Sequence, residues 1–262
     1  MKSNKFKNVP LLLATLVCFS IISLPASLLA SEVDISMGAG VAVVPDYEGS
    51  EDYTAAPLLM LNAKWAQGYY VKFMGNRLRV NVVPNNTWSV GPVLQYRGKR
   101  DDDVSNNKVG DMKTIDATLE AGVFGAFKAE GWDGSLQWVT DTSNSHDGAL
   151  ATLDAGYAFT AAGLKNRVGM SMTYADKDYM DTYFSVDSRD ADRSGLDRYK
   201  ADSGLKDIGI NLSSNYAFND KWGLTGLIKY SALLNDAKDS PVVDDEGSNS
   251  QFTFGLMATY KF

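Results

Sequence analysis

The chain contains one histidine, His146, which stands in the polar segment Ser-Asn-Ser-His-Asp-Gly over 143–148. A serine nucleophile needs a base within hydrogen-bond reach, and Asp141 or Asp147 could orient the imidazole, so these residue types could serve a hydrolase. Outer-membrane lipid hydrolases place a serine two residues after the histidine, whereas this chain has Gly148 there, in a setting typical of a turn. We therefore expect a solvated loop histidine, no catalytic residue and no enzyme, with a histidine–carboxylate protease site as the alternative.

Two acidic runs could in principle hold a metal ion. Asp101-Asp102-Asp103 and Asp244-Asp245-Glu246 supply the hard oxygen ligands that Ca²⁺ prefers. Neither run has the spaced Asp/Asn and Gly pattern of a dedicated calcium loop. We therefore expect solvated loops, and we predict neither a metal site nor a cofactor.

Residues 1–30 have the composition of a secretory signal peptide. Three lysines precede an apolar run over 9–22 and a stretch of small residues, an order typical of export signals. A retained transmembrane anchor is the alternative, but the run is shorter than the ~20 apolar residues that span a bilayer. We expect cleavage after Ala30, or alternatively after Ala26, to leave 31–262 as a single domain.

The charge and cysteine content exclude other classes. The chain carries 32 acidic and 25 basic residues, and loss of the signal peptide removes three lysines and no acid, so the mature part is strongly acidic. Such a chain is a poor nucleic-acid binder. The single cysteine, Cys18, falls within the signal peptide, so the mature chain needs no disulfide.

Apolar residues alternate with polar ones through most of the mature chain. In lipid every backbone polar group must be paired internally, so a non-helical spanning chain has to close into a barrel with one face of each strand toward lipid. The alternation predicts an all-β fold, a transmembrane antiparallel up-and-down β-barrel of 12 strands. They fall near 33–43, 59–65, 69–73, 78–82, 88–96, 115–127, 132–138, 149–159, 168–174, 208–218, 222–230 and 251–262.

The connections support the same topology. Odd-numbered connections include long polar segments, the longest over about 176–206, whereas the even-numbered ones are brief. Bacterial barrels have short periplasmic turns and longer external loops, so the sorting favours a barrel in the outer membrane. Without the short hairpin at 69–83 the same parity would give ten strands, which is the alternative count.

Aromatic residues mark the membrane interfaces and the end of the chain. Trp88, Trp132 and Trp222 stand beside brief connections, where an amphipathic ring can lie at the headgroup level. The final strand carries aromatics on its lipid face and ends in a bare aromatic. We interpret these residues as the signal for the outer-membrane insertion machinery: Phe252, Phe254, Tyr260 and Phe262.

Charged residues occupy the opposite parity, which we expect to face the lumen. Both signs occur together, so the charges could pair into a filled interior or line a narrow selective channel, and we favour the filled interior. The predicted lumen charges are Asp34, Lys64, Lys72, Arg77, Arg79, Arg97, Asp116, Glu120, Asp154, Asp207 and Lys229.

Several motifs bring a family into view. The run GAGVAVVPDYEGSEDY over 38–53, the segment YMDTYFSV over 179–186, the stretch over 194–222 and the ending ATYKF resemble the MltA-interacting protein (MipA/OmpV) family across the mature chain. The family pattern names no catalytic residue. Its recognition marks here are Tyr183, Phe184 and the motif loop of Pro45, Asp46, Tyr47, Glu48 and Gly49.

The resemblance implies an outer-membrane barrel that in some members is a scaffold between a lytic transglycosylase and a penicillin-binding protein, and in others an adhesin or surface protein. The expected partners are outer-membrane lipid, lipopolysaccharide and those murein enzymes. The alternatives are a narrow channel for small solutes and surface recognition through the acidic loops. Periplasmic turns this short limit any docking surface, which counts against the scaffold on physical grounds.

Overall fold

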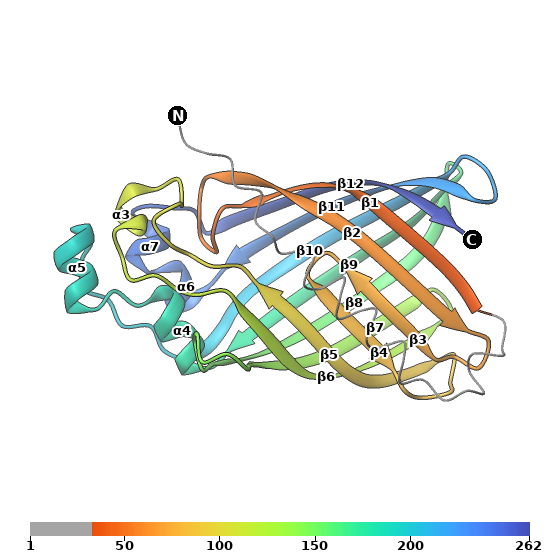
Figure 1. Cartoon of the computed structure of the whole chain (residues 1–262), viewed down its shortest axis with the longest axis horizontal. Helices are drawn as coiled ribbons and strands as arrows, with labels where there is room; N and C mark the ends of the chain where they lie inside the picture. Colours follow the sequence, from red (N-terminus) through yellow and green to blue (C-terminus); the bar gives the residue numbers. More distant parts are fainter. Residues whose placement is uncertain (1–32) are drawn as a thin grey trace.

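The structure, a computed structural model, describes residues 33–262, and the predicted signal peptide lies outside the described residues. Twelve antiparallel strands close into one barrel in which every strand pairs with its neighbours in the sequence and β1 pairs with β12 (Figure 1). The strands are β1 Val33–Pro45, β2 Tyr53–Trp65, β3 Tyr70–Met74, β4 Arg77–Asn81, β5 Trp88–Arg97, β6 Thr118–Ala129, β7 Trp132–Asp141, β8 Ala149–Ala161, β9 Leu164–Ala175, β10 Gly204–Ala217, β11 Trp222–Leu233 and β12 Ser250–Lys261.

The predicted barrel with 12 strands is confirmed. The short hairpin, without which the barrel would have ten strands, is present as β3 and β4. Closure is made between β1 and β12, whose register runs from Ser36 opposite Lys261 to Val43 opposite Phe254. Because this pairing removes the two free edges of the sheet, the strand backbones have no edge that lipid would have to solvate.

The alternation of side chains follows from lipid on one face and the lumen on the other. Along β12, Phe252, Phe254 and Leu256 are exposed, whereas Gln251 and Met257, which have the opposite parity on either side of them, are buried. Exposed apolar side chains at every second position are the expected state for residues that face acyl chains. The barrel wall, formed by the twelve strands, therefore has its apolar face outward, as the period-two pattern predicts.

Aromatic side chains gather at the end of the wall with short turns. Trp132 lies 4.8 Å from Tyr157 between ring centroids, and Trp222 lies 4.8 Å from Tyr260. Both pairs bridge neighbouring strands beside brief connections, where an interfacial aromatic belt is expected. These contacts agree with the predicted position of the membrane interface.

The long connections fold into five short helices at the opposite end of the barrel, shown at the left of Figure 1. Asp176 begins α4 by accepting a hydrogen bond from the backbone N–H of Tyr179 at 3.0 Å, and Gly195 ends α5 with a left-handed φ of 73°. The helices are α3 Asn107–Gly110, α4 Lys177–Phe184, α5 Ser188–Ser194, α6 Asn235–Lys238 and α7 Pro241–Asp244. Within 33–262, no helix has the length and apolarity that a membrane span requires.

These helices and loops form a cap over the outer mouth of the barrel. Tyr179, Met180 and Phe184 of α4 are buried together with inward-facing side chains of the wall, among them Val93 and Phe124. A second apolar cluster joins the connections to one another and includes Tyr47, Met112 and Val242. The cap is therefore packed onto the wall, and it closes the barrel at its long-loop end.

We expect a charge on the outward face to destabilise the barrel according to its depth. Leu136 lies midway along β7 and is 56% exposed, so Leu136→Arg should cost about 2–4 kcal/mol of unfolding free energy. Val82, also 56% exposed, adjoins a short turn, and Val82→Arg should cost about 1 kcal/mol or less as the interfacial control. Urea titration of both variants in lipid vesicles measures the difference, and equal costs would contradict the proposed membrane depth.

Candidate functional site

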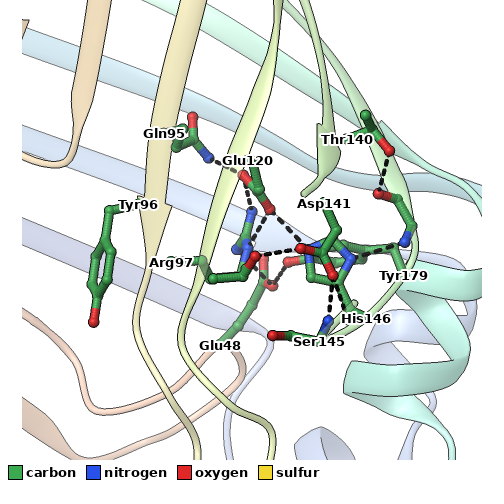
Figure 2. Close-up of polar contacts among 12 residues, drawn as sticks. Glu48, Gln95, Tyr96, Arg97, Glu120, Thr140, Asp141, Ser145, His146 and Tyr179 are labelled. Carbon is green, nitrogen blue, oxygen red and sulfur yellow. Dashed lines mark hydrogen bonds and ion pairs between the residues drawn. The ribbon is translucent and has the colours of Figure 1, made fainter. Parts of the chain in front are cut away.

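Ionisable side chains meet where the cap rests on the wall, and we call this group the outer charge cluster (Figure 2). Its members come from the loop after β1, from β5, β6 and β10, from the loop after β7 and from α4. They are Glu48, Arg97, Glu120, His146, Tyr179 and Lys206.

Glu48 connects three separate parts of the cluster. Its carboxylate pairs with Lys206, accepts a hydrogen bond from the Tyr179 hydroxyl and lies 3.9 Å from the guanidinium of Arg97. Burial by itself would raise the pKa of Glu48, but the charges of Lys206 and Arg97 outweigh it and lower the pKa to about 2. Glu48 is therefore ionised throughout the ordinary pH range and ties the first loop to the wall and to α4.

Arg97 and Glu120 form the second half of the cluster on neighbouring strands. Arg97 Nε donates to Glu120 at 2.7 Å, and the Gln95 amide donates to the other carboxylate oxygen at 2.9 Å. The Arg97 guanidinium also lies 4.9 Å from the ring centroid of Tyr179. Glu120 has no exposed surface, so its negative charge is balanced by protein groups, with Arg97 as the cation paired with it.

His146 is part of this cluster and is only 3% exposed, so the predicted solvated histidine was wrong. Its Nδ1 accepts from the Gly148 N–H at 3.0 Å, which leaves the proton on Nε2, 3.2 Å from Glu120. The ring packs edge-on against Tyr179 and Tyr183. The turn folds back into the barrel mouth, which the local sequence does not reveal.

The geometry around His146 does not form a hydrolytic triad. The carboxylate of Asp141 binds the backbone N–H groups of Ser143, Ser145 and His146 rather than the imidazole. Among the described residues, no serine or threonine hydroxyl is hydrogen-bonded to either ring nitrogen of His146. His146 therefore hydrogen-bonds to the barrel wall through Glu120 and packs its ring against α4 of the cap.

The motif loop holds neighbouring loops in place. Asp46 accepts from the backbone of Ser105 at 2.8 Å, and the Tyr47 hydroxyl donates to the carbonyl of Glu246. Burial raises the pKa of Tyr47 to about 12, so its hydroxyl stays protonated. Gly49, with φ of 95°, receives Ser248 N–H on its carbonyl, while Pro45 is the last residue of β1.

Tyr183 and Phe184 of α4 connect this helix to other segments of the cap through their backbone carbonyls. The buried guanidinium of Arg100 donates to the carbonyl of Tyr183 at 2.9 Å, and Ser240 Oγ donates to that of Phe184 at 2.6 Å. Burial raises the pKa of Tyr183. Arg100 and Lys206 are buried members of this site that sequence reasoning missed, since neither the acidic run beside Arg100 nor the strand pattern around Lys206 marks them as buried.

The acidic runs form pairs with nearby side chains. Lys99 pairs with Asp101 and Asp103, and Glu246 accepts from Asn106 and pairs with Lys108. Within 33–262, no group of three or more histidine, cysteine or acidic side chains is arranged to hold a metal ion. These runs therefore serve as local contacts in the cap.

Ten of the predicted lumen charges lie on strands: Asp34, Lys64, Lys72, Arg77, Arg79, Arg97, Glu120, Asp154, Asp207 and Lys229. Contacts between non-adjacent strands mark the inner face, as when Arg79 of β4 donates to Gln137 of β7 at 2.8 Å. Asp116 was wrongly predicted. It is exposed and precedes β6, because Ile115 pairs with Arg100 in an isolated bridge and the strand begins only at Thr118.

A second cluster lies deeper in the lumen around Arg167 of β9. Its guanidinium binds Asp133 of β7 at 2.9 Å through Nε, pairs with Asp154 of β8 and donates to Asn211 of β10 at 2.8 Å. The sequence analysis missed Arg167 and Asp133, although their parity in β9 and β7 would have identified both. Asp133 and Asp154 are thus both paired with Arg167.

The residues proposed as the insertion signal lie on the outer face at the end of the chain. Phe252, Phe254 and Phe262 are 40%, 46% and 66% exposed, and Tyr260 packs between Trp222 and Phe262. Their recognition by the insertion machinery stays a prediction.

Comparison with known proteins gives a consistent result. A family model described as MltA-interacting protein MipA matches residues 37–262. The MltA-interacting protein of Escherichia coli (strain K12) is 25% identical over 253 residues, which cover 92% of this chain and 96% of that protein. The outer membrane protein OmpV of Vibrio cholerae is 26% identical over 198 residues, covering 74% and 71%. Among solved structures, an outer membrane channel from Pseudomonas putida F1 has a TM-score of 0.44 at 10% identity, covering 91% of this chain and 99% of that one.

We expect the cap to loosen in acid because of Glu48. Its pKa is depressed, so its contribution to stability is complete above the ordinary carboxyl value of 4.5 and is lost as the pH falls toward about 2. Pepsin cleavage within 176–203 should therefore accelerate over this range in wild-type protein held in nanodiscs. Glu48→Gln should be cleaved faster at about pH 5 and should lose most of the difference by about pH 2. A constant ratio of the two rates at all pH values would contradict this role.

Proposed function

The chain belongs to the MltA-interacting protein (MipA) family, and from this premise we propose that it is a docking scaffold for a murein-cleaving enzyme rather than an enzyme itself. It is an outer-membrane β-barrel, so its short turns reach the periplasm. A relative named for its interaction with MltA is the main support for a periplasmic partner. The family resemblance suggests a lytic transglycosylase for that partner.

The division between the two ends of the barrel supports docking at the short turns. The long loops are folded on one another and on the wall, and their aromatic residues are buried in the cap. At the other end the turns between strands are 66–69, 82–87, 130–131, 162–163 and 218–221. A stable interface buries about 800 Å² on each partner, so several turns must contribute jointly.

Exposed lysines at this rim give a partner charged positions to recognise. Lys128, Lys165 and Lys221 belong to three different strand connections or their adjoining strand ends, and all are exposed. Charges on the rim of an interface mainly steer association and select partners. An acidic surface on the partner is the complement that such a rim favours.

We expect charge reversal at the rim to weaken docking by about tenfold or more, mainly through slower association. The test measures binding of a purified lytic transglycosylase to nanodisc-held Lys128→Glu/Lys165→Glu/Lys221→Glu. The matched control, Lys177→Glu/Arg198→Glu/Lys200→Glu, places the same charges on exposed cap residues and should bind as the wild type does. Equal affinity of the rim variant and the wild type would argue against docking there.

A narrow channel is the second candidate, because water-accessible lysines lie inside the barrel. Lys72 and Lys229 have inward positions in β3 and β11 and are nevertheless exposed. The cap acts against this candidate, since it packs onto the wall at the outer mouth. We favour a lumen that is closed at rest.

We expect wild-type protein in planar bilayers to show no steady conductance. Replacement of 177–200 by a Gly-Ser linker of equal length removes α4 and α5 and should produce open channels, because the lumen then has no cover. Lys64→Ala/Arg79→Ala with the cap intact should remain silent. Steady current through the wild type that changes with Lys64→Ala/Arg79→Ala would overturn the closed lumen and favour transport.

A further inference from the structure

The lumen below the cap contains positive charges that lack acidic partners. On the inner face of the β3–β4 hairpin, Lys72 stands directly opposite Arg79, and Arg77 lies two residues before Arg79 on the same face. Like charges directly opposite on paired strands are destabilising. Lys229 projects from β11, where it pairs in register with Asn211 and Thr253, and its charge is repelled by that of Arg77. We call Lys72, Arg77, Arg79 and Lys229 the lumen cation cluster.

None of these four side chains forms an ion pair with a described residue. Arg77 Nε donates to the neutral amide oxygen of Gln95 at 2.8 Å, and Arg79 donates to that of Gln137. Each oxygen accepts hydrogen bonds but carries no full charge, so the repulsion between the cations is not cancelled.

The nearby carboxylates are already committed to other cations. Glu120 is held by Arg97 at 2.7 Å, and Asp133 and Asp154 share Arg167. Asp207, whose negative charge attracts Lys229, already pairs with Lys206 at 2.6 Å. The lumen therefore contains a chain of neighbouring cations, from Lys72 through Arg79 and Arg77 to Lys229, that no carboxylate of the described residues pairs.

The cluster faces a part of the lumen that solvent can reach. Lys72 and Lys229 are enclosed by the wall, since Lys72 shares a rung with Asn62, Arg79 and Val93, yet both lysines are exposed. The cap closes the outer end of this space, so access is from the short-turn end. The exposed ammonium groups are the part of the cluster that a small solute can contact.

We propose that the lumen cation cluster is a binding site for a small multivalent anion, phosphate- or carboxylate-bearing, that enters from the periplasm. Two arginines supply planar donors that match such oxyanions, and two solvent-exposed lysines supply ammonium groups on flexible side chains. Binding of an anion is favoured further because its negative charge offsets the repulsion among the four cations. This inference is independent of docking at the turns.

The test titrates wild-type protein in nanodiscs with inorganic phosphate and, separately, with succinate by calorimetry at low ionic strength. At least one of them should bind, and which one binds identifies the phosphate or carboxylate class. Lys72→Gln and Lys229→Gln should each weaken binding by about tenfold, and the double variant by about a hundredfold. The control Lys177→Gln/Lys200→Gln makes the same charge change on exposed cap residues and should bind as the wild type does.

A stability measurement separates loss of the site from loss of the fold. Without an anion, Lys72→Gln/Lys229→Gln should unfold at higher urea concentration than the wild type, because repulsion is relieved. The wild type should gain stability when the anion is added, whereas the double variant should not. Failure of both anions to bind the wild type, or unchanged affinity in the double variant, would overturn the proposal.

Discussion

Backbone hydrogen bonding in lipid is the constraint on which the structure depends. A strand edge inside a bilayer would leave N–H and C=O groups without partners, so β12 must return to β1. Closure then fixes two faces on every strand. Leu256 faces acyl chains because Met257 beside it faces inward, and the apolar outer face and polar interior are two consequences of one geometry.

Closure also creates an interior in which charges interact strongly. At the outer mouth, ion pairs join four separate chain segments through Glu48, Arg97, Glu120 and Lys206. These pairs hold the cap on the wall. Deeper in the lumen the balance differs, because the cations of the β3–β4 hairpin face neutral amides rather than carboxylates. The charges at the outer mouth are thus paired and packed, whereas the cations of the β3–β4 hairpin have no ion-pair partner among the described residues.

This contrast bears on what the barrel can do. Within 33–262, His146 is hydrogen-bonded to Glu120 and Gly148 and packed against tyrosine rings, and no hydroxyl nucleophile is hydrogen-bonded to it. The motif loop has a physical role in this chain, since Asp46 binds the backbone of Ser105, Tyr47 binds the carbonyl of Glu246, and Glu48 binds Tyr179 of α4. The short-turn end remains the part of the protein that a periplasmic partner or solute can reach.

The sequence alone predicted the strands and their faces and favoured twelve strands over ten, because period-two alternation is local and lipid enforces it at every residue. It also placed charges such as Lys72 and Arg79 inward, since parity alone decides that. It did not determine His146, because burial there depends on how the turn folds against α4, nor the pairing of Glu48 with Lys206, which lie 158 residues apart. Strand order and register bring such residues together, so only the tertiary structure decided which charges are paired and which are left for a ligand.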